Sequence, residues 1–251
     1  MEKSETDKAI GGYLKEFIND GDYLQIGIGG ILNALVDNLM EKKDLGIHSE
    51  LVTTSIMRLM KAGVVNNERK QINKGKTVTC FAFGTEELYE FLDNNPSILF
   101  LDNAYTNDPY IVGQNDNMIS INTTVEVDLT GQCCSESIGT KQVSGSGGQA
   151  DMAVGAQRSK NGKSFICLTS TVITKDPVTG EKIESSKIVP TLKEGVVVTL
   201  ARADVDYVVT EFGVADLRGT SVKERVHALI GIANPRFREE LLYEAKKMLY
   251  I

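Results

Sequence analysis

The first group of residues in this sequence that could do chemistry is the segment GIGG, residues 27–30. It stands between an apolar run and an amphipathic pattern, where free backbone N–H groups can face an anion or an oxyanion. The alternative is a tight strand–helix turn that needs glycine only for packing. Leu32 occupies the place of the third glycine of a GxGxxG motif, so the segment does not match the dinucleotide-binding fingerprint.

The second group is the loop SGSGGQAD, residues 144–151. Gly147 and Gly148 are adjacent and precede an expected helix, with Asp151 in its first turn. Two successive glycines let a ligand approach the backbone closely. A flexible surface loop would have the same composition, so the sequence leaves both readings open.

Two further segments contain carboxylates at strand positions. His48 and Glu50 are two residues apart in an apolar strand and therefore share a face, and a carboxylate can itself act as a nucleophile. A Ser/His/acid triad is disfavoured, because the chain has two histidines and no GxSxG motif. Glu211 ends another expected strand within VTEFGVADLRG; its alternative role is to cap the next turn or to pair with Arg218.

The elements that must position these groups alternate between strand and helix patterns. Apolar runs predict strands at residues 23–28, 46–53, 78–83, 119–129, 165–168, 196–200 and 207–210. Helical spacing predicts helices at residues 10–18, 32–40, 55–62, 86–92 and 221–230, and a last helix opened by Asn234-Pro235. This order favours an α/β fold with an open, largely parallel sheet flanked by helices. We expect residues 1–251 to form a single domain.

Composition excludes several classes of function. The 251 residues carry a net charge of −7, which argues against nucleic acid or an anionic membrane as the main partner. Four cysteines without CxxC spacing predict reduced thiols, and two histidines exclude a histidine-rich metal site. The N-terminus is charged from its second residue, and the longest uncharged stretch, residues 23–36, is shorter than the ~20 residues of a membrane span. We therefore expect a soluble, cytoplasmic protein that binds no metal.

Seven motifs occur in a fixed order along nearly the whole chain: LQIGIGGILNAL, GIHSE, NDPYIVGQNDNMISIN, VEVDLTGQ, SIGTK, GGQAD and VTEFGVADLRG. Together they resemble the C-terminal half of the acetyl-CoA hydrolase/transferase family, and most of all the 4-hydroxybutyrate and butyrate:acetate CoA-transferases. The resemblance implies a sheet of the CoA-transferase (NagB/RpiA-like) type.

The same resemblance implies an activity and a set of site residues. It implies transfer of CoA between short-chain carboxylic acids by a ping-pong mechanism, with Glu50 as the nucleophile that forms a glutamyl-CoA thioester. The backbone N–H groups of Ile28 and Gly148 would be the oxyanion donors. Contacts with CoA fall on Gly27, Gly29, Gly30, Asn122, Gly147 and Gly148, and the substrate pocket includes His48 and Glu211. Coenzyme A and acyl-CoA would be substrates, with no permanently bound cofactor.

Two other functions stay open: an acyl-CoA hydrolase, in which water resolves the intermediate, and a non-catalytic CoA-binding or interaction domain. The chain departs from the family pattern at Leu32, at Met152 and in the segment LVTTSIMRL after Glu50, where relatives carry Asp-Gly. Relatives also have a preceding α/β half. We expect a homo-oligomer or a partner subunit to supply it, and the sequence does not specify the pair of acids.

Overall fold

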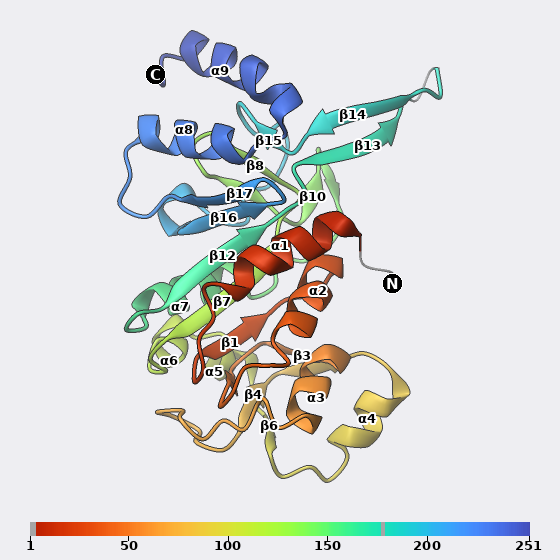
Figure 1. Cartoon of the computed structure of the whole chain (residues 1–251), viewed down its shortest axis with the longest axis vertical. Helices are drawn as coiled ribbons and strands as arrows, with labels where there is room; N and C mark the ends of the chain where they lie inside the picture. The colour runs from red at the N-terminus through yellow and green to blue at the C-terminus, as the bar shows by residue number, and fades with distance from the viewer. Residues whose placement is uncertain (1–3, 177–178) are drawn as a thin grey trace. The chain divides into compact units, whose positions relative to one another are not determined.

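The computed structural model describes residues 4–176 and 179–251 (Figure 1). The chain divides into two compact units. Unit 1 comprises Met1–Asn122 and Gly148–Phe165, and unit 2 comprises Thr123–Gly147 and Ile166–Ile251.

Unit 1 contains the GIGG and GIHSE motifs and the helices α1 to α7. Its helices are α1 (Glu5–Lys15), α2 (Gly30–Asn38), α3 (Thr54–Lys61), α4 (Glu86–Leu92), α5 (Asn103–Thr106), α6 (Pro109–Val112) and α7 (Gln149–Arg158). Its strands are β1 (Tyr23–Ile26), β2 (Gly46–Ile47), β3 (Leu51–Thr53), β4 (Thr77–Thr79), β5 (Phe81–Phe83), β6 (Ile98–Phe100) and β7 (Met118–Thr123), and β12 (Lys163–Cys167) begins in it.

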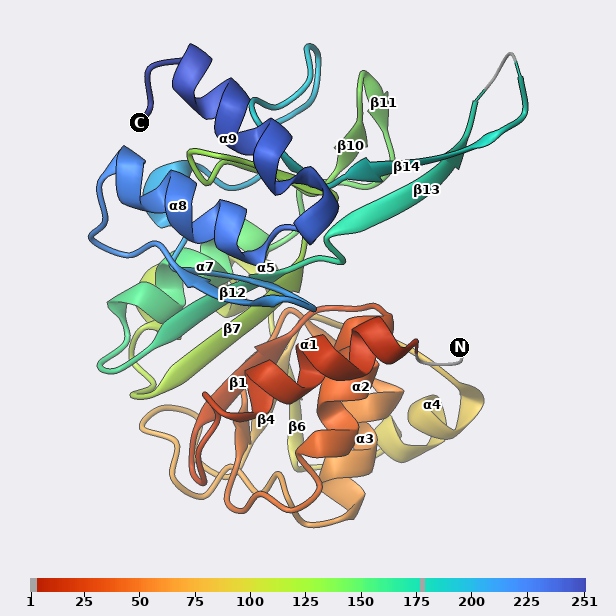
Figure 2. The ribbon, with the colours of Figure 1, turned by 45° about the horizontal axis from the view of Figure 1, so that its top comes forward.

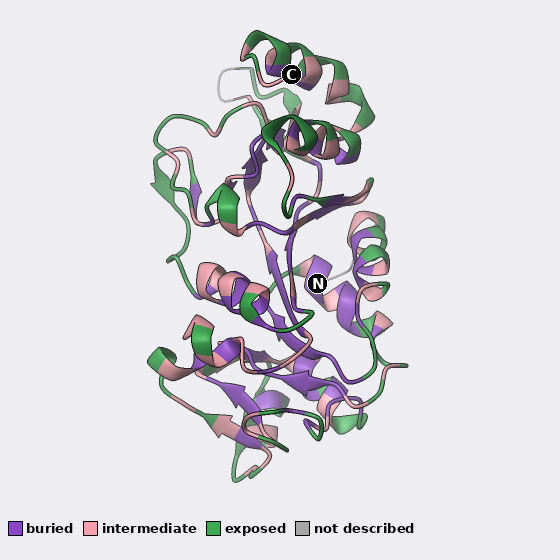
Figure 3. Cartoon of the chain, turned by 90° about the vertical axis from the view of Figure 1, so that its left-hand side faces the viewer, coloured by how far each residue is buried: buried purple, intermediate pink, exposed green. Residues whose placement is uncertain are grey.

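The following four strand pairs of unit 1 are all parallel. β1 pairs with β2 on one side and with β7 on the other, β3 pairs with β5, and β4 pairs with β6. Helices α1 and α2 cover one face of the β1–β7 sheet, and α6 and α7 cover the other (Figures 1 and 3). Because both faces are covered, all four residues of β1 are buried.

The two faces of this sheet have separate apolar cores. On one face, Tyr23 of β1 and Met118 of β7 pack with Val112 of α6 and with Met152 and Ala156 of α7. On the other, α1 lies along α2 (Figure 2). These contacts fix α2 and α7, whose N-termini follow the two glycine segments, against the sheet.

Unit 2 is built from short strands and two long helices. Its strands are β8 (Glu126–Asp128), β9 (Cys133–Cys134), β10 (Ser137–Ile138), β11 (Lys141–Gln142), β13 (Thr171–Lys175), β14 (Lys182–Ser186), β15 (Ile188–Val189), β16 (Tyr207–Thr210) and β17 (Gly213–Asp216). Its helices are η1 (Arg202–Asp204), α8 (Val222–Ile232), η2 (Pro235–Phe237) and α9 (Arg238–Lys247). β8 lies between β15, which is parallel to it, and antiparallel β9; β13–β14, β10–β11 and β16–β17 are antiparallel hairpins.

The α/β fold with a largely parallel sheet is confirmed, and so are most expected elements. The helix at residues 86–92 and the strand at 207–210 have the predicted bounds. The expected strand at residues 46–53 is two strands, with His48-Ser49-Glu50 between them. The expected strands at residues 78–83 and 119–129 are also each two strands, β4 and β5 in the first case and β7 and β8 in the second. The expected strand at residues 196–200 is wrong: only Leu200 forms an isolated bridge, to Cys133, and Val197 and Val198 are exposed. In the described ranges, no helix is both long and apolar enough to cross a membrane.

Candidate active site

Glu50 lies in unit 1, directly before β3, and its backbone is fixed there. Its carbonyl oxygen accepts hydrogen bonds from the N–H groups of Cys80 at 2.9 Å and Phe81 at 3.2 Å. The side chain is half-buried. A strand connection thus holds the Cα of Glu50 while its carboxylate reaches the end of the sheet.

The backbone N–H of Gly148 donates a hydrogen bond to Glu50 Oε2 at 2.9 Å, across 98 residues of sequence. Gly148 is the N-cap residue of α7, so the positive end of that helix faces the carboxylate. A Cβ at position 148 would lie 2.7 Å from Glu50 Oε2. The site therefore requires glycine because the carboxylate touches the backbone itself.

Asn107 is a residue of this site that sequence reasoning did not single out. Asn107 is buried. A Cβ built on Gly148 would touch both the Nδ2 of Asn107 and the Oε2 of Glu50, so the amide and the carboxylate both lie against Gly148. The Oδ1 of Asn107 is 4.0 Å from the Cys80 Sγ. The available signal was the NDPY motif: Asp108 caps α6 and Pro109 follows at its first position, so Asn107, the C-cap residue of α5, stands directly before that cap.

The GIGG segment forms the turn between β1 and α2. Gly29 is the N-cap residue of α2, and its φ of +135° is a conformation that favours glycine. Ile28 is 56% exposed, and among the described residues its N–H has no hydrogen-bond acceptor. An oxyanion site requires a backbone donor without an acceptor in the protein, and a glycine turn can provide one.

A cleft of about 620 Å³ opens beside this turn, within unit 1. Residues 27–29 form one wall, residues 53–55 at the start of α3 and residues 83–85 form others, and Asn33 of α2 completes the lining. We call it the turn cleft.

Asn122 supports the glycine turn from inside the sheet. Its amide exchanges hydrogen bonds of 2.9 and 3.0 Å with the amide of Gln25, and Ser120 Oγ donates to Gln25 Oε1 at 2.7 Å. A Cβ on Gly27 would lie 3.1 Å from Asn122 Oδ1. The assignment of Asn122 to CoA binding stays a prediction, while its structural role is to hold the end of β1.

His48 is fully buried and contacts the last residue of α5, the helix that Asn107 caps. Its Nε2 lies 2.8 Å from the carbonyl oxygen of Thr106. Burial, together with the charge of Lys70, lowers the pKa of His48 to about 4, so the neutral ring donates to that carbonyl at neutral pH. Its assignment to the substrate pocket stays a prediction.

Lys70 is a buried amine whose partners are uncharged. Its Nζ donates to the carbonyl oxygens of Ile47 and Lys76, both at 2.9 Å, and burial lowers its pKa to about 7. These bonds tie the segment after α3 to the end of β2, the strand that leads into His48.

Glu211 and Gly147 belong to unit 2. Glu211 opens the two-residue turn between β16 and β17, and its carboxylate accepts from Ser170 N at 2.9 Å and Ser170 Oγ at 2.6 Å. Burial lowers the pKa of nearby Lys187, an effect that the negative charges of Glu211 and Glu126 oppose. Gly147 has φ of +56°, which favours glycine.

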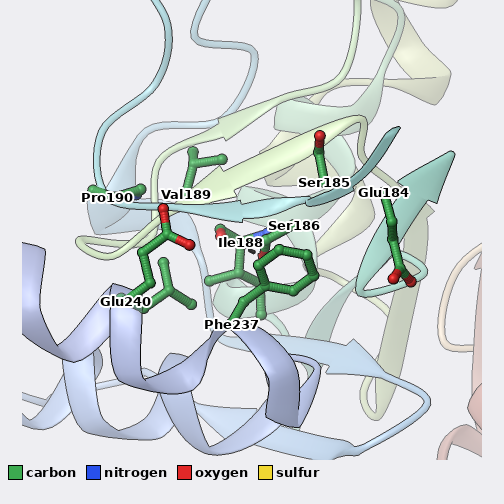
Figure 4. A pocket seen from close by; sticks show the side chains of 9 residues that line it. Glu184, Ser185, Ser186, Ile188, Val189, Pro190, Phe237 and Glu240 are labelled. Atoms are coloured by element: carbon green, nitrogen blue, oxygen red, sulfur yellow. Dashed lines mark hydrogen bonds between the residues drawn. The ribbon is translucent and has the colours of Figure 1, made fainter. Parts of the chain in front are cut away.

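Unit 2 also has a cavity of about 310 Å³ between β14–β15 and α9 (Figure 4). Phe237 and Ile188 form its apolar part. Glu184 at its edge is ion-paired with Arg236 at 2.9 Å, and Ser186 Oγ donates to the carbonyl oxygen of Ile188 at 2.7 Å. None of the expected site residues lines this cavity. The described residues contain no group of three His, Cys, Asp or Glu side chains placed to hold a metal ion.

The structure thus joins Glu50, Gly148 and Asn107 at the end of a parallel sheet, with the Ile28 turn in the same unit. The class that the fold and this site define is an α/β protein with a carboxylate held by a backbone N–H at the start of a helix.

Comparisons with known proteins identify the family. The profile of the acetyl-CoA hydrolase/transferase C-terminal domain matches residues 84–245. The chain is 51% identical over 242 residues to a succinyl-CoA:cyclohexane-1-carboxylate CoA transferase of Geobacter metallireducens, covering 96% of the chain and 54% of that protein. It is 49% identical over 243 residues to a 4-hydroxybutyrate coenzyme A transferase of Clostridium kluyveri, covering 97% and 55%.

The crystal structure of RipA from Yersinia pestis superimposes with a TM-score of 0.91 at 40% identity, covering the whole chain and 55% of RipA. The chain belongs to the acetyl-CoA hydrolase/transferase family, as the motifs indicated. It spans about half the length of the curated relatives it matches.

Proposed function

We propose that this chain carries the nucleophile of a CoA-transferase that moves CoA between short-chain carboxylic acids. The observation that supports this most directly is the 2.9 Å hydrogen bond from the Gly148 N–H to Glu50 Oε2. It holds a carboxylate oxygen at the positive end of a helix, in a family whose similar members are named for CoA transfer.

In the first step, a carboxylate oxygen of Glu50 attacks the thioester carbonyl of an acyl-CoA. The carbon–sulfur bond breaks, an acyl-glutamyl anhydride forms, and CoA leaves as a thiolate. The thiolate then attacks the side-chain carbonyl carbon of Glu50. The anhydride bond to that carbon breaks, the first acid leaves as a carboxylate, and Glu50 is left as a thioester of CoA.

In the second half, another carboxylate repeats these steps in reverse and leaves as its own CoA ester. The glutamyl thioester and the acyl thioester are chemically alike and have similar free energies. Neither half-reaction therefore ends in an intermediate too stable to react further. Each attack builds a negative charge on oxygen. The N–H groups of Ile28 and Gly148 are the proposed donors to it, and one such donor lowers the activation barrier by ~3 kcal/mol.

Two side chains complete the proposed machinery. Asn107 adds an amide donor beside Glu50 Oε2, because its Nδ2 lies against Gly148. Glu211, held at two points by Ser170, is proposed to face the reacting acyl group. Contacts with the rest of CoA, proposed at Gly27, Gly29, Gly30, Asn122 and Gly147, would keep the thioester in place during both steps.

Because the curated relatives are about twice as long as this chain, we propose that a second polypeptide or a second copy completes the site. A site enclosed on all sides excludes water, which would otherwise hydrolyse the anhydride and the thioester.

Intact mass spectrometry tests the proposal. The chain is mixed with butyryl-CoA or acetyl-CoA and treated with borohydride, which reduces a glutamyl thioester to an alcohol. We expect a CoA adduct, and after borohydride the alcohol, on Glu50. The matched control is Glu50→Gln, which keeps the size of the side chain but has no nucleophilic oxygen anion.

The outcomes separate three functions. An adduct on Glu50 that a carboxylic acid discharges as a new CoA ester supports the transferase. Consumption of the CoA ester without any acceptor acid would indicate a hydrolase. CoA binding without an adduct, with or without a protein that supplies the other half, would contradict catalysis by Glu50.

A further inference from the structure

His48 lies two residues before Glu50, and the sheet of unit 1 holds its backbone. Its N–H donates to the carbonyl oxygen of Leu24 in β1 at 3.2 Å, and an isolated parallel bridge joins it to Val78 of β4. The residue is fully buried. The imidazole ring therefore has a fixed place relative to the nucleophile, and it can fix the group that it binds.

The ring donates a hydrogen bond to the end of helix α5. Nε2 of His48 lies 2.8 Å from the carbonyl oxygen of Thr106, the last residue of α5. A carbonyl oxygen only accepts, so the hydrogen of this bond is on Nε2. The last carbonyl groups of a helix have no donor within the helix, and Thr106 is fully buried. His48 thus supplies the donor that α5 itself cannot provide.

This carbonyl belongs to the peptide group that leads into Asn107. The carbonyl of Thr106 and the N–H of Asn107 lie in one plane, because the peptide bond is rigid. The N–H of Asn107 donates to the carbonyl oxygen of Asn103 at 2.9 Å. The peptide is thus held at its oxygen by His48 and at its nitrogen by Asn103. These two bonds fix the direction in which the side chain of Asn107 leaves the backbone.

The amide of Asn107 lies beside the nucleophile. A Cβ on Gly148 would touch both the Nδ2 of Asn107 and the Oε2 of Glu50. The amide oxygen is on the side of Cys80, whose Sγ lies 4.0 Å from Asn107 Oδ1 and 3.5 Å from Asn103 Oδ1. A thiol is a weak donor, so it does little to hold the amide. The position of the amide therefore depends mainly on the backbone of Asn107.

We propose that His48 is a positioning residue for the transfer reaction. By fixing the peptide between Thr106 and Asn107, it holds the amide of Asn107 where Nδ2 donates to Glu50 during the attack on the thioester. An unsatisfied buried carbonyl is costly, so without the ring this peptide shifts toward another donor and displaces the amide. The proposal rests on the proposed function, and it gives the ring no bond to make or break and no contact with the substrate.

A double-mutant cycle tests the proposal, because residues that act through one another have non-additive effects. The single variants are His48→Leu, which removes the donor, and Asn107→Ala, which removes the amide; the third is the double variant. The rate at which butyryl-CoA labels Glu50 is measured by mass spectrometry over a range of butyryl-CoA concentrations. Every sample contains the full 251-residue chain and any protein that supplies the other half.

Two further variants complete the design. In His48→Gln, the Nε2 of glutamine takes the place of the ring Nε2 and keeps a donor for Thr106. His227→Leu is the matched control, since His227 is the other histidine of the chain and is exposed on α8. Tm is measured for every variant. If His48→Leu does not fold, His48→Asn replaces it in the cycle, because an asparagine amide ends near the position of Nδ1 and does not reach Thr106.

We expect Asn107→Ala to slow labelling about 100-fold, the effect of losing one donor at the reacting centre. His48→Leu should slow it about tenfold in the wild-type background and less than about twofold in the Asn107→Ala background, because the amide that it positions is then absent. His48→Gln should restore most of the rate, and His227→Leu should leave it unchanged. The butyryl-CoA concentration at half-maximal rate should be the same with and without the imidazole ring.

Three outcomes would overturn the proposal. An unchanged rate in His48→Leu, or an equal loss of rate in both backgrounds, would mean that the ring does not act through Asn107. A higher half-maximal concentration with an unchanged maximal rate would mean that the ring contributes to substrate binding instead. Failure of the wild-type chain to label at all would refute the proposed function itself and the positioning role with it, whereas the first two outcomes leave catalysis by Glu50 intact.

Discussion

The contact between Gly148 and Glu50 leads to a sharp prediction for the variant Gly148→Ala. Gly148 has φ of −90° and ψ of 13°, which alanine adopts without strain. The new methyl group would lie 2.7 Å from Glu50 Oε2 and would also clash with the Asn107 amide. The substitution therefore acts on the carboxylate and its neighbour, and not on the backbone conformation.

The expected effects on activity and stability differ greatly. Displacing the carboxylate breaks its hydrogen bond to the Gly148 N–H, and losing one such donor costs a factor of about 100 to 1,000 in rate. The added methyl group lowers the free energy of unfolding by about 1–3 kcal/mol because it overpacks the site. Alanine raises it by about 0.4–1 kcal/mol, because it restricts the conformations of the unfolded chain. At about 2–4 °C per kcal/mol, Tm falls by less than about 10 °C.

The assay is the rate of Glu50 labelling by butyryl-CoA in single-turnover mass spectrometry, with Tm measured in parallel. Gly145→Ala is the control, because nothing lies within 4 Å of a Cβ there and its φ is not positive. If Gly148→Ala labels Glu50 at the wild-type rate, the N–H of Gly148 does not support the nucleophile. If Tm falls by far more than expected, the loss of labelling reports unfolding instead.

Three other predictions concern stability, pH and the second carboxylate. Gly29→Ala should lower the free energy of unfolding by about 1–3 kcal/mol in denaturant titration, because φ of +135° strains alanine; an unchanged midpoint would contradict the observed turn. Lys70 has a pKa of about 7 in the folded chain and 10.5 ordinarily, so the folded state binds fewer protons between these values and stability rises with pH there, by up to about 1.4 kcal/mol per unit. In Lys70→Met the free energy of unfolding should rise less steeply with pH, and a rise as steep as in the wild type would argue against a buried amine. Burial of His48 likewise makes the free energy of unfolding rise with pH, between pH 4 and 6.5. Ser170→Ala removes the Oγ–H donor 2.6 Å from Glu211 and should lower the labelling rate about tenfold with little change in Tm, and an unaffected rate would argue against a role for Glu211 in the reaction.

The elements that the sequence predicted with the right bounds carry clear local signals. The helix at residues 86–92 begins with two acidic residues, Glu86 and Glu87, and the strand at residues 207–210 is a short run in which Val208, Val209 and Thr210 are buried. The run Val196-Val197-Val198 has the composition of a strand, but Val197 and Val198 are exposed and unpaired. Hairpin β13–β14 was missed for the opposite reason, since its residues are mostly exposed and show no apolar pattern.

The site could be predicted only in part. Local sequence marks Gly29 as a turn residue and Gly148 as the start of a helix, but nothing local links position 148 to Glu50, which lies 98 residues earlier. That link came from the order of the family motifs. Asn107 was missed because a single asparagine at the end of a short helix has no partner at a diagnostic spacing; only the fold brings its amide against Gly148.

The separation of Glu50 and Gly148 along the chain also has a consequence for biosynthesis. Unit 1 is not contiguous: residues 123–147, which belong to unit 2, are translated before its last segment, Gly148–Phe165. At about 5–20 residues per second, the 98 residues that separate Gly148 from Glu50 take about 5–20 s to translate. During that interval a nascent chain holds Glu50 without its N–H partner, so this contact forms only after strands β1 to β7 have been translated.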